Sequence, residues 1–144
     1  MRFLLALAVV SASLARAEEP ALSAPWCAAK HQKLVTIDRE AITVLDAWDA
    51  YRHNARGWDA ALYRRKTAEG AAAVARLLES GEQAAKDAAR CTAAGFRSTP
   101  AQRVAYRRNE KDFHRVEPVL AALQDAWASM RDAERTQLMA GVKK

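Results

Sequence analysis

The sequence predicts an all-α fold, an antiparallel bundle of three long helices. Apolar residues recur at heptad spacing along most of the chain, and no segment alternates apolar and polar residues as a strand would. The composition agrees, because 51% of the 144 residues are hydrophobic and the chain has only 5 Gly and 4 Pro. This length suits one domain. We therefore expect residues 18–144 to form a single helical-bundle domain.

Residues 1–17 have the three parts of a secretory signal peptide. Arg2 supplies a positive charge, an apolar run follows over residues 3–10, and Ala15-Arg16-Ala17 forms a small-residue cleavage site. The apolar run is too short to span a bilayer. We therefore expect the mature protein to be exported, either to the periplasm or out of the cell.

The first predicted helix follows the start signal Ser23-Ala24-Pro25 and carries an apolar stripe at heptad spacing. The stripe comprises Cys27, Leu34, Ile37, Ala41, Val44, Trp48, Tyr51 and Ala55. A turn is predicted at residues 54–57, where the sequence Asn-Ala-Arg-Gly interrupts the pattern. The second predicted helix carries a similar stripe. It comprises Tyr63, Thr67, Gly70, Val74, Leu77, Gly81, Ala84, Ala88 and Cys91.

The only cysteines of the chain are Cys27 and Cys91. An even pair in an exported chain predicts a disulfide. This bond would join the beginning of the first helix to the end of the second, so that the two helices run antiparallel. The disulfide should stabilise the fold by roughly 4 kcal/mol, because it lowers the chain entropy of the unfolded state.

The predicted disulfide also sets the register of the two helices. It places Ile37 opposite Gly81 and Trp48 opposite Gly70, so that large residues face small ones. This accounts for two glycines inside a helix, each of which costs about 1 kcal/mol relative to alanine. The alternative is a break at residues 80–83, where Ser and Gln could form a capping box. We favour the continuous helix.

The third predicted helix begins at Thr99–Gln102, with a threonine cap, proline at the first helical position and glutamine at the third. Its stripe comprises Tyr106, Phe113, Val116, Leu120, Leu123, Trp127 and Met130. Pro118 predicts a kink in this helix, because the stripe passes it without changing phase. The alternative is that Pro118 begins a fourth helix. Gly141 is the predicted end.

A second apolar stripe on the first helix comprises Val35, Ile42 and Leu45. It faces either the third helix or a second copy of the chain, so self-association is left open by the sequence.

The sequence offers little for catalysis or cofactor binding. It contains no Gly-rich phosphate loop, no CxxC and no HExxH motif, and a disulfide leaves no thiol nucleophile. His31, His53 and His114 fall at different heights of the predicted bundle, too far apart to share a metal ion. Glu110, His114 and Glu117 lie beside the apolar stripe, where a solvated ion-pair face is the simpler interpretation. No histidine falls in a core stripe, as a haem ligand would require. We therefore predict a non-enzymatic protein with no metal and no cofactor.

Basic residues gather at the turn between the first two helices, a region that we name the basic elbow. The candidate partner-binding residues there are Arg52, Arg56, Trp58, Arg64, Arg65 and Lys66. Trp and Arg are enriched at binding hot spots, and Trp58 belongs to neither stripe. A second basic region comprises Arg97, Arg103, Arg107, Arg108, Lys111 and Arg115.

The formal net charge of +6, part of which lies in the signal peptide, is too small to predict a nucleic-acid partner. Our first hypothesis is a small exported protein that binds the acidic surface of another protein in the cell envelope, as an inhibitor, immunity-type factor or adaptor. The alternative is binding of an anionic envelope polymer or of lipid headgroups, with an affinity that falls steeply with salt. A metal-binding bundle ranks third.

Overall fold

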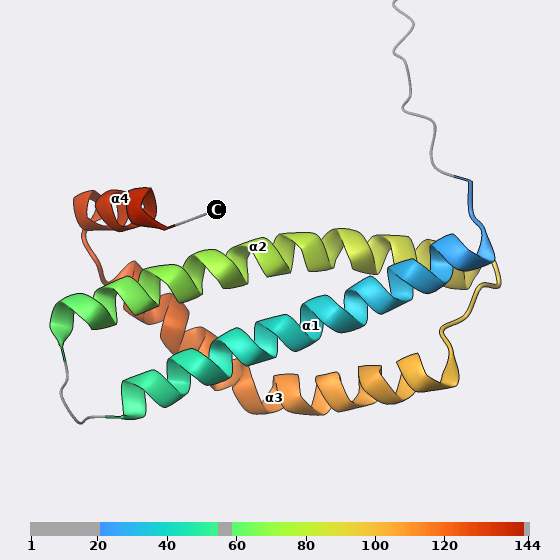
Figure 1. Ribbon diagram of the computed structural model, residues 1–144, viewed down its shortest axis with the longest axis horizontal. Coiled ribbons are helices and arrows are strands. Elements are labelled where there is room, and N and C mark those ends of the chain that lie inside the picture. Colours follow the sequence, from blue (N-terminus) through green and yellow to red (C-terminus); the bar gives the residue numbers. More distant parts are fainter. Residues whose placement is uncertain (1–20, 55–58, 143–144) are drawn as a thin grey trace, which may run out of the picture.

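The computed structural model describes residues 21–54 and 59–142, so the predicted signal peptide lies outside the described residues. This part of the chain contains four helices and no strand (Figure 1). The helices are α1 (Ala24–His53), α2 (Ala60–Ala93), α3 (Pro100–Ala128) and α4 (Asp132–Gly141). Helices α1 and α2 lie side by side and antiparallel, and α3 packs against both. The predicted all-α bundle is confirmed.

Helices α1 and α3 begin where the sequence predicts them to begin. The side chain of Ser23 accepts a hydrogen bond from the backbone nitrogen of Trp26, 3.3 Å away, at the first turn of α1. In α3, Gln102 N donates to Thr99 Oγ1 over 3.1 Å, and Thr99 N donates to Gln102 Oε1 over 2.9 Å. These two bonds are the predicted capping box. Helix α2 continues through residues 80–83 without a break.

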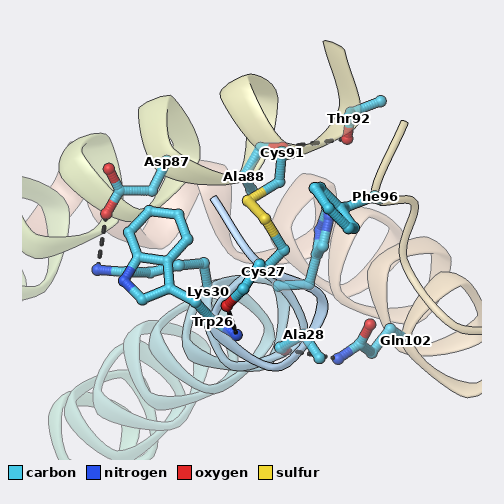
Figure 2. Close-up of a disulfide and its surroundings, with 12 residues drawn as sticks. Trp26, Cys27, Ala28, Lys30, Asp87, Ala88, Cys91, Thr92, Phe96 and Gln102 are labelled. Atoms are coloured by element: carbon cyan, nitrogen blue, oxygen red, sulfur yellow. Dashed lines mark hydrogen bonds and ion pairs between the residues drawn. A yellow bond between two sulfur atoms is a disulfide. The ribbon is translucent and has the colours of Figure 1, made fainter. Parts of the chain in front are cut away.

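The disulfide joins Cys27 to Cys91 at one end of the α1–α2 pair, with the two Cα atoms 5.6 Å apart (Figure 2). The predicted register is confirmed further along. A Cβ atom on Gly81 would lie 3.3 Å from Ile37 Cγ2. A Cβ atom on Gly70 would lie 3.8 Å from Cδ1 of Trp48. The bulky α1 side chains therefore sit over the two glycines of α2.

The second apolar stripe of α1 faces α3. Ile42 and Leu45 are fully buried and belong to one core cluster with Val116 and Leu123 of α3. Near the other end of α3, Asn109 Nδ2 donates to the backbone oxygen of Val35 over 3.0 Å. The third helix thus covers the stripe that could otherwise have met a second copy of the chain.

Helix α3 passes through Pro118 as one helix and changes direction in its middle (Figure 1). A proline removes a backbone donor and bends a helix at this point. The preferred prediction is confirmed, and the alternative that Pro118 begins a fourth helix is wrong.

The predicted end of the third helix at Gly141 is also wrong, because α3 ends at Ala128. Arg131 adopts an extended backbone with φ −67° and ψ 149°, and a separate helix, α4, runs to Gly141. The first turn of α4 is acidic, which suits the positive end of the helix dipole. The break lets α4 return to α2, where Arg64 Nε lies 3.1 Å from Glu134 Oε1. It contains neither Gly nor Pro, so the sequence gives no strong signal for it.

Candidate functional site

The basic elbow is largely paired within the chain. Arg52 Nε lies 2.7 Å from Asp49 Oδ1, and its guanidinium lies 5.0 Å from the ring centre of Trp48. Of the other predicted residues, Arg56 and Trp58 lie outside the described residues. The guanidinium of Arg52 therefore interacts with residues of its own helix.

The α2 side of the elbow is similar. Arg64 pairs with Glu134 of α4, and Lys66 Nζ lies 3.5 Å from Glu69 Oε2. Arg65 is exposed and has no ion pair within the described residues. Of the four elbow residues that the structure describes, three thus have an acidic neighbour that reduces their attraction for an external anion.

More cations of the second basic region have no acidic partner within the described residues. We define the basic face of α3 as Arg103, Arg107, Arg108 and Lys111, all of which are exposed. None of them has an acidic partner within the described part of the chain, although Arg103 Nη1 donates to the backbone oxygen of Ser98 over 2.5 Å. Val104 lies among them and is 67% exposed. This face therefore combines cations with an apolar side chain.

Arg115 does not belong to this face, because its guanidinium is paired. Its Nη1 and Nη2 donate to the two carboxylate oxygens of Asp46 over 2.7 and 2.9 Å. The hydrogen bond from Arg115 holds the pKa of Asp46 below its ordinary value. This pair links α1 to α3 and is structural.

A groove of about 480 Å³ lies on another side of α3, where α1, α2 and α3 meet. We call it the three-helix groove. Its apolar lining comprises Leu34, Ala41, Leu77, Leu78, Gly81, Ala85 and Phe113. Its polar lining comprises Asp38, Glu82, Tyr106, Asn109, Glu110 and His114. Leu78 lines this groove and is 45% exposed.

The carboxylates give the groove a negative character. Asp38 is half-buried, and its side chain has no ion pair or hydrogen bond among the described residues. Burial raises the pKa of this carboxyl. Glu110 is exposed and likewise has no ion pair within the described ranges. Glu82 differs, because it accepts a hydrogen bond from Lys86 over 2.7 Å, which lowers its pKa.

A buried histidine adjoins the groove, although no histidine lies on a predicted core stripe. His31 is only 4% exposed. Its Nδ1 lies 3.0 Å from the hydroxyl of Tyr106, and its Nε2 donates to the backbone oxygen of Phe96 over 3.2 Å. The histidine was missed because it lies off the heptad stripe. Its position one helical turn after Cys27 is the signal that could have revealed it.

The structure brings together no metal-binding cluster within the described residues. No group of three or more His, Cys, Asp or Glu side chains there is placed to hold an ion. In the candidate cluster of the sequence, His114 Nδ1 lies 3.9 Å from Glu117 Oε2, and both side chains are exposed. In the same residues, no helix combines the length and apolar content that a membrane span requires.

Comparisons with protein families, with curated proteins and with solved structures found no match to this chain.

Proposed function

We propose that this protein is a non-enzymatic binding protein of the cell envelope, which holds the acidic surface of a partner protein against the basic face of α3. The observation that carries this proposal is the set of exposed cations on this face that have no acidic partner within the described residues. Paired cations, such as those of the basic elbow, have less to gain from an external carboxylate.

The spacing of these cations suits a folded partner. Arg103, Arg107 and Lys111 follow one another every four residues, so they form a row about 12 Å long on a rigid helix. Arginine can bind a carboxylate through two parallel hydrogen bonds, which gives the contact a defined geometry. A partner that presents carboxylates at similar intervals would be favoured over one with the same charge spread irregularly.

Val104 favours a protein over a polysaccharide. Its exposed side chain lies among the arginines and would gain free energy only if a partner covered it with apolar groups. Protein interfaces typically place such apolar contacts inside a polar rim. An anionic polymer or a layer of lipid headgroups would neutralise the cations and leave Val104 in water.

Export is part of the proposal. It is supported by the signal-peptide pattern of residues 1–17 and by the disulfide, because such bonds persist in oxidising compartments.

The proposal can be tested by affinity capture from an envelope extract, with residues 18–144 as bait. The test variant combines Arg107→Glu with Lys111→Glu. The control combines Lys33→Glu with Arg76→Glu, two exposed cations on α1 and α2 that also have no ion pair in the described residues. The two variants have the same net charge, so only the position of the change differs.

We expect a stoichiometric partner to be retained by the wild type and the control and to be lost by the α3 variant. Retention by the α3 variant, or equal loss from both variants, would contradict the proposal. Capture of an anionic polymer or of anionic vesicles, with an affinity that falls steeply with salt, would support the alternative instead.

A further inference from the structure

We propose that the three-helix groove is a second docking site, and that its occupant is a short amphipathic helix of a partner protein with a lysine or arginine at its centre. This inference does not depend on the proposed function, because it concerns a different side of α3 and a partner of opposite charge.

The shape of the groove matches a helix of about two turns. The lining residues of α1 extend from Leu34 to Ala41, a rise of about 10 Å. Those of α2 extend from Leu77 to Ala85, and those of α3 from Tyr106 to His114, which are similar lengths. All three helices thus border the same short segment, and a fourth helix could lie among them. Such a helix would insert apolar residues at positions i, i+3 or i+4, and i+7.

The charge of the groove determines which helix can bind. Asp38 lies midway along the α1 lining, and an occupant would bury its carboxylate further. Burial of an unpaired charge is costly, and a cation of the occupant would offset this cost. Glu110 adds negative charge at the rim.

The basic side chains near the groove do not pair with Asp38. The ammonium of Lys86 already lies 2.7 Å from Glu82. His114 lies at the α3 rim with its Nδ1 3.9 Å from Glu117. Neither has an ion pair with Asp38 in the structure. A partner lysine or arginine is therefore the simplest complement of Asp38.

The described part of the chain leaves this groove open. Helix α4 is the nearest candidate for a cover, but it packs at the beginning of α2, where Glu134 pairs with Arg64. The α2 residues that border a hollow with α4 extend from Ala61 to Glu69, which is about two turns of α2 before Leu77. The apolar side chains of Leu77, Leu78 and Phe113 are thus available to an external helix.

The basic face of α3 and the three-helix groove carry charges of opposite sign on one rigid body. The basic face of α3 would attract an acidic partner, and the groove would hold a basic amphipathic helix. This arrangement suits an adaptor that joins two proteins of opposite charge.

The experiment uses a panel of labelled helical peptides, capped at both ends, with leucines at i, i+3 or i+4, and i+7 and one central lysine or arginine. A matched panel carries glutamate in place of the central cation. Binding to residues 18–144 is measured by fluorescence anisotropy at neutral pH and physiological salt. The contact is mapped from the NMR shifts of Leu34, Leu77 and Leu78.

The test variant is Asp38→Asn, and its matched control is Asp125→Asn, which makes the same change at an exposed aspartate outside the groove. A second variant, Ala85→Trp, fills the groove without altering its charge. Thermal unfolding of each variant confirms that it folds.

We expect at least one cationic peptide to bind, the glutamate panel to fail, and Asp38→Asn to weaken binding about tenfold or more, while Asp125→Asn has no effect. Ala85→Trp should also abolish binding. The proposal is overturned if no cationic peptide binds at a concentration of about 1 mM. Equal affinity of the two aspartate variants, or NMR shifts confined to the basic face of α3, would overturn it too.

A second copy of the chain is a competing occupant. Sedimentation analysis would reveal it as an association that grows with concentration and that Ala85→Trp removes. That outcome would replace the partner helix proposed here.

Discussion

The indole nitrogen of Trp48 on α1 donates a hydrogen bond to the hydroxyl oxygen of Thr67 on α2, with an Nε1–Oγ1 distance of 3.1 Å. Both residues are buried, with 4% and 0% of their surface exposed. The bond lies far along α1 from the disulfide, so it fixes the register of the helix pair at the opposite end.

Thr67→Val should therefore destabilise the fold. Valine keeps the shape of threonine but cannot accept a hydrogen bond, so the buried indole N–H would lose its partner. We expect the free energy of unfolding to fall by about 1–3 kcal/mol, measured by urea denaturation with circular dichroism. Thr43→Val is the control, because the exposed hydroxyl of Thr43 bonds only to its own helix. Equal losses in the two variants would contradict this role of Thr67.

The two glycines of α2 should respond differently to alanine. A Cβ atom at Gly70 would lie 3.6 Å or more from its neighbours, so Gly70→Ala should gain helix propensity and raise stability by up to about 1 kcal/mol. At Gly81 the same atom would lie 3.3 Å from Ile37 Cγ2, and this tight contact should cancel part of the gain. Thermal denaturation of both variants tests this order. A larger gain at Gly81 would show that the helices separate more easily there.

Removal of the disulfide should lower the free energy of unfolding by roughly 4 kcal/mol, because the bond closes a loop with a sequence separation of 64 residues. The measurement compares urea denaturation of the wild type with that of the double variant Cys27→Ser and Cys91→Ser. Addition of a reductant should destabilise the wild type and leave the variant unchanged. A reductant effect on the variant would point to a different cause.

Asp87 should make the stability of the fold depend on pH in the acidic range. Its carboxylate accepts a hydrogen bond from Lys30 Nζ at 2.8 Å, which holds its pKa below the ordinary value of 3.8, although burial opposes this shift. The folded chain therefore binds this proton less readily than the unfolded chain. The stabilisation is complete above pH 3.8 and is lost as the pH falls through the lower pKa of the folded state.

The measurement is the urea midpoint between about pH 2 and 6 for the wild type, Asp87→Asn and the control Asp125→Asn. The dependence on pH should be weaker in Asp87→Asn and unchanged in the control. An identical dependence in the wild type and Asp87→Asn would assign the acid effect to other carboxylates.

The sequence was sufficient to predict most of the structure of the α1–α2 pair. The heptad stripes and the caps at Ser23 and Thr99 depend on local spacing, and two cysteines allow only one pairing within the chain. The structure confirms the two caps and the disulfide. The break after Ala128 could not be predicted from local spacing. It follows from the contact of α4 with α2, which joins residues far apart in the chain.

The candidate surfaces were harder to predict for the same reason. Basic residues could be counted in the sequence, but Glu134 reaches Arg64 only after α4 turns back. The groove likewise needs three helices in place before Asp38 and Leu78 share one surface. The burial of His31 depends on the backbone of Phe96 and on Tyr106, which heptad spacing does not reveal.

The disulfide lies at the end of the α1–α2 pair opposite to the connection between the two helices. The segment from Cys27 to Cys91 is therefore a closed covalent ring. A protease that cuts this ring once cannot release either helix, and the two pieces would migrate as one species in electrophoresis until a thiol opened the bond. Such a nicked molecule would still have α1 and α2 covalently joined.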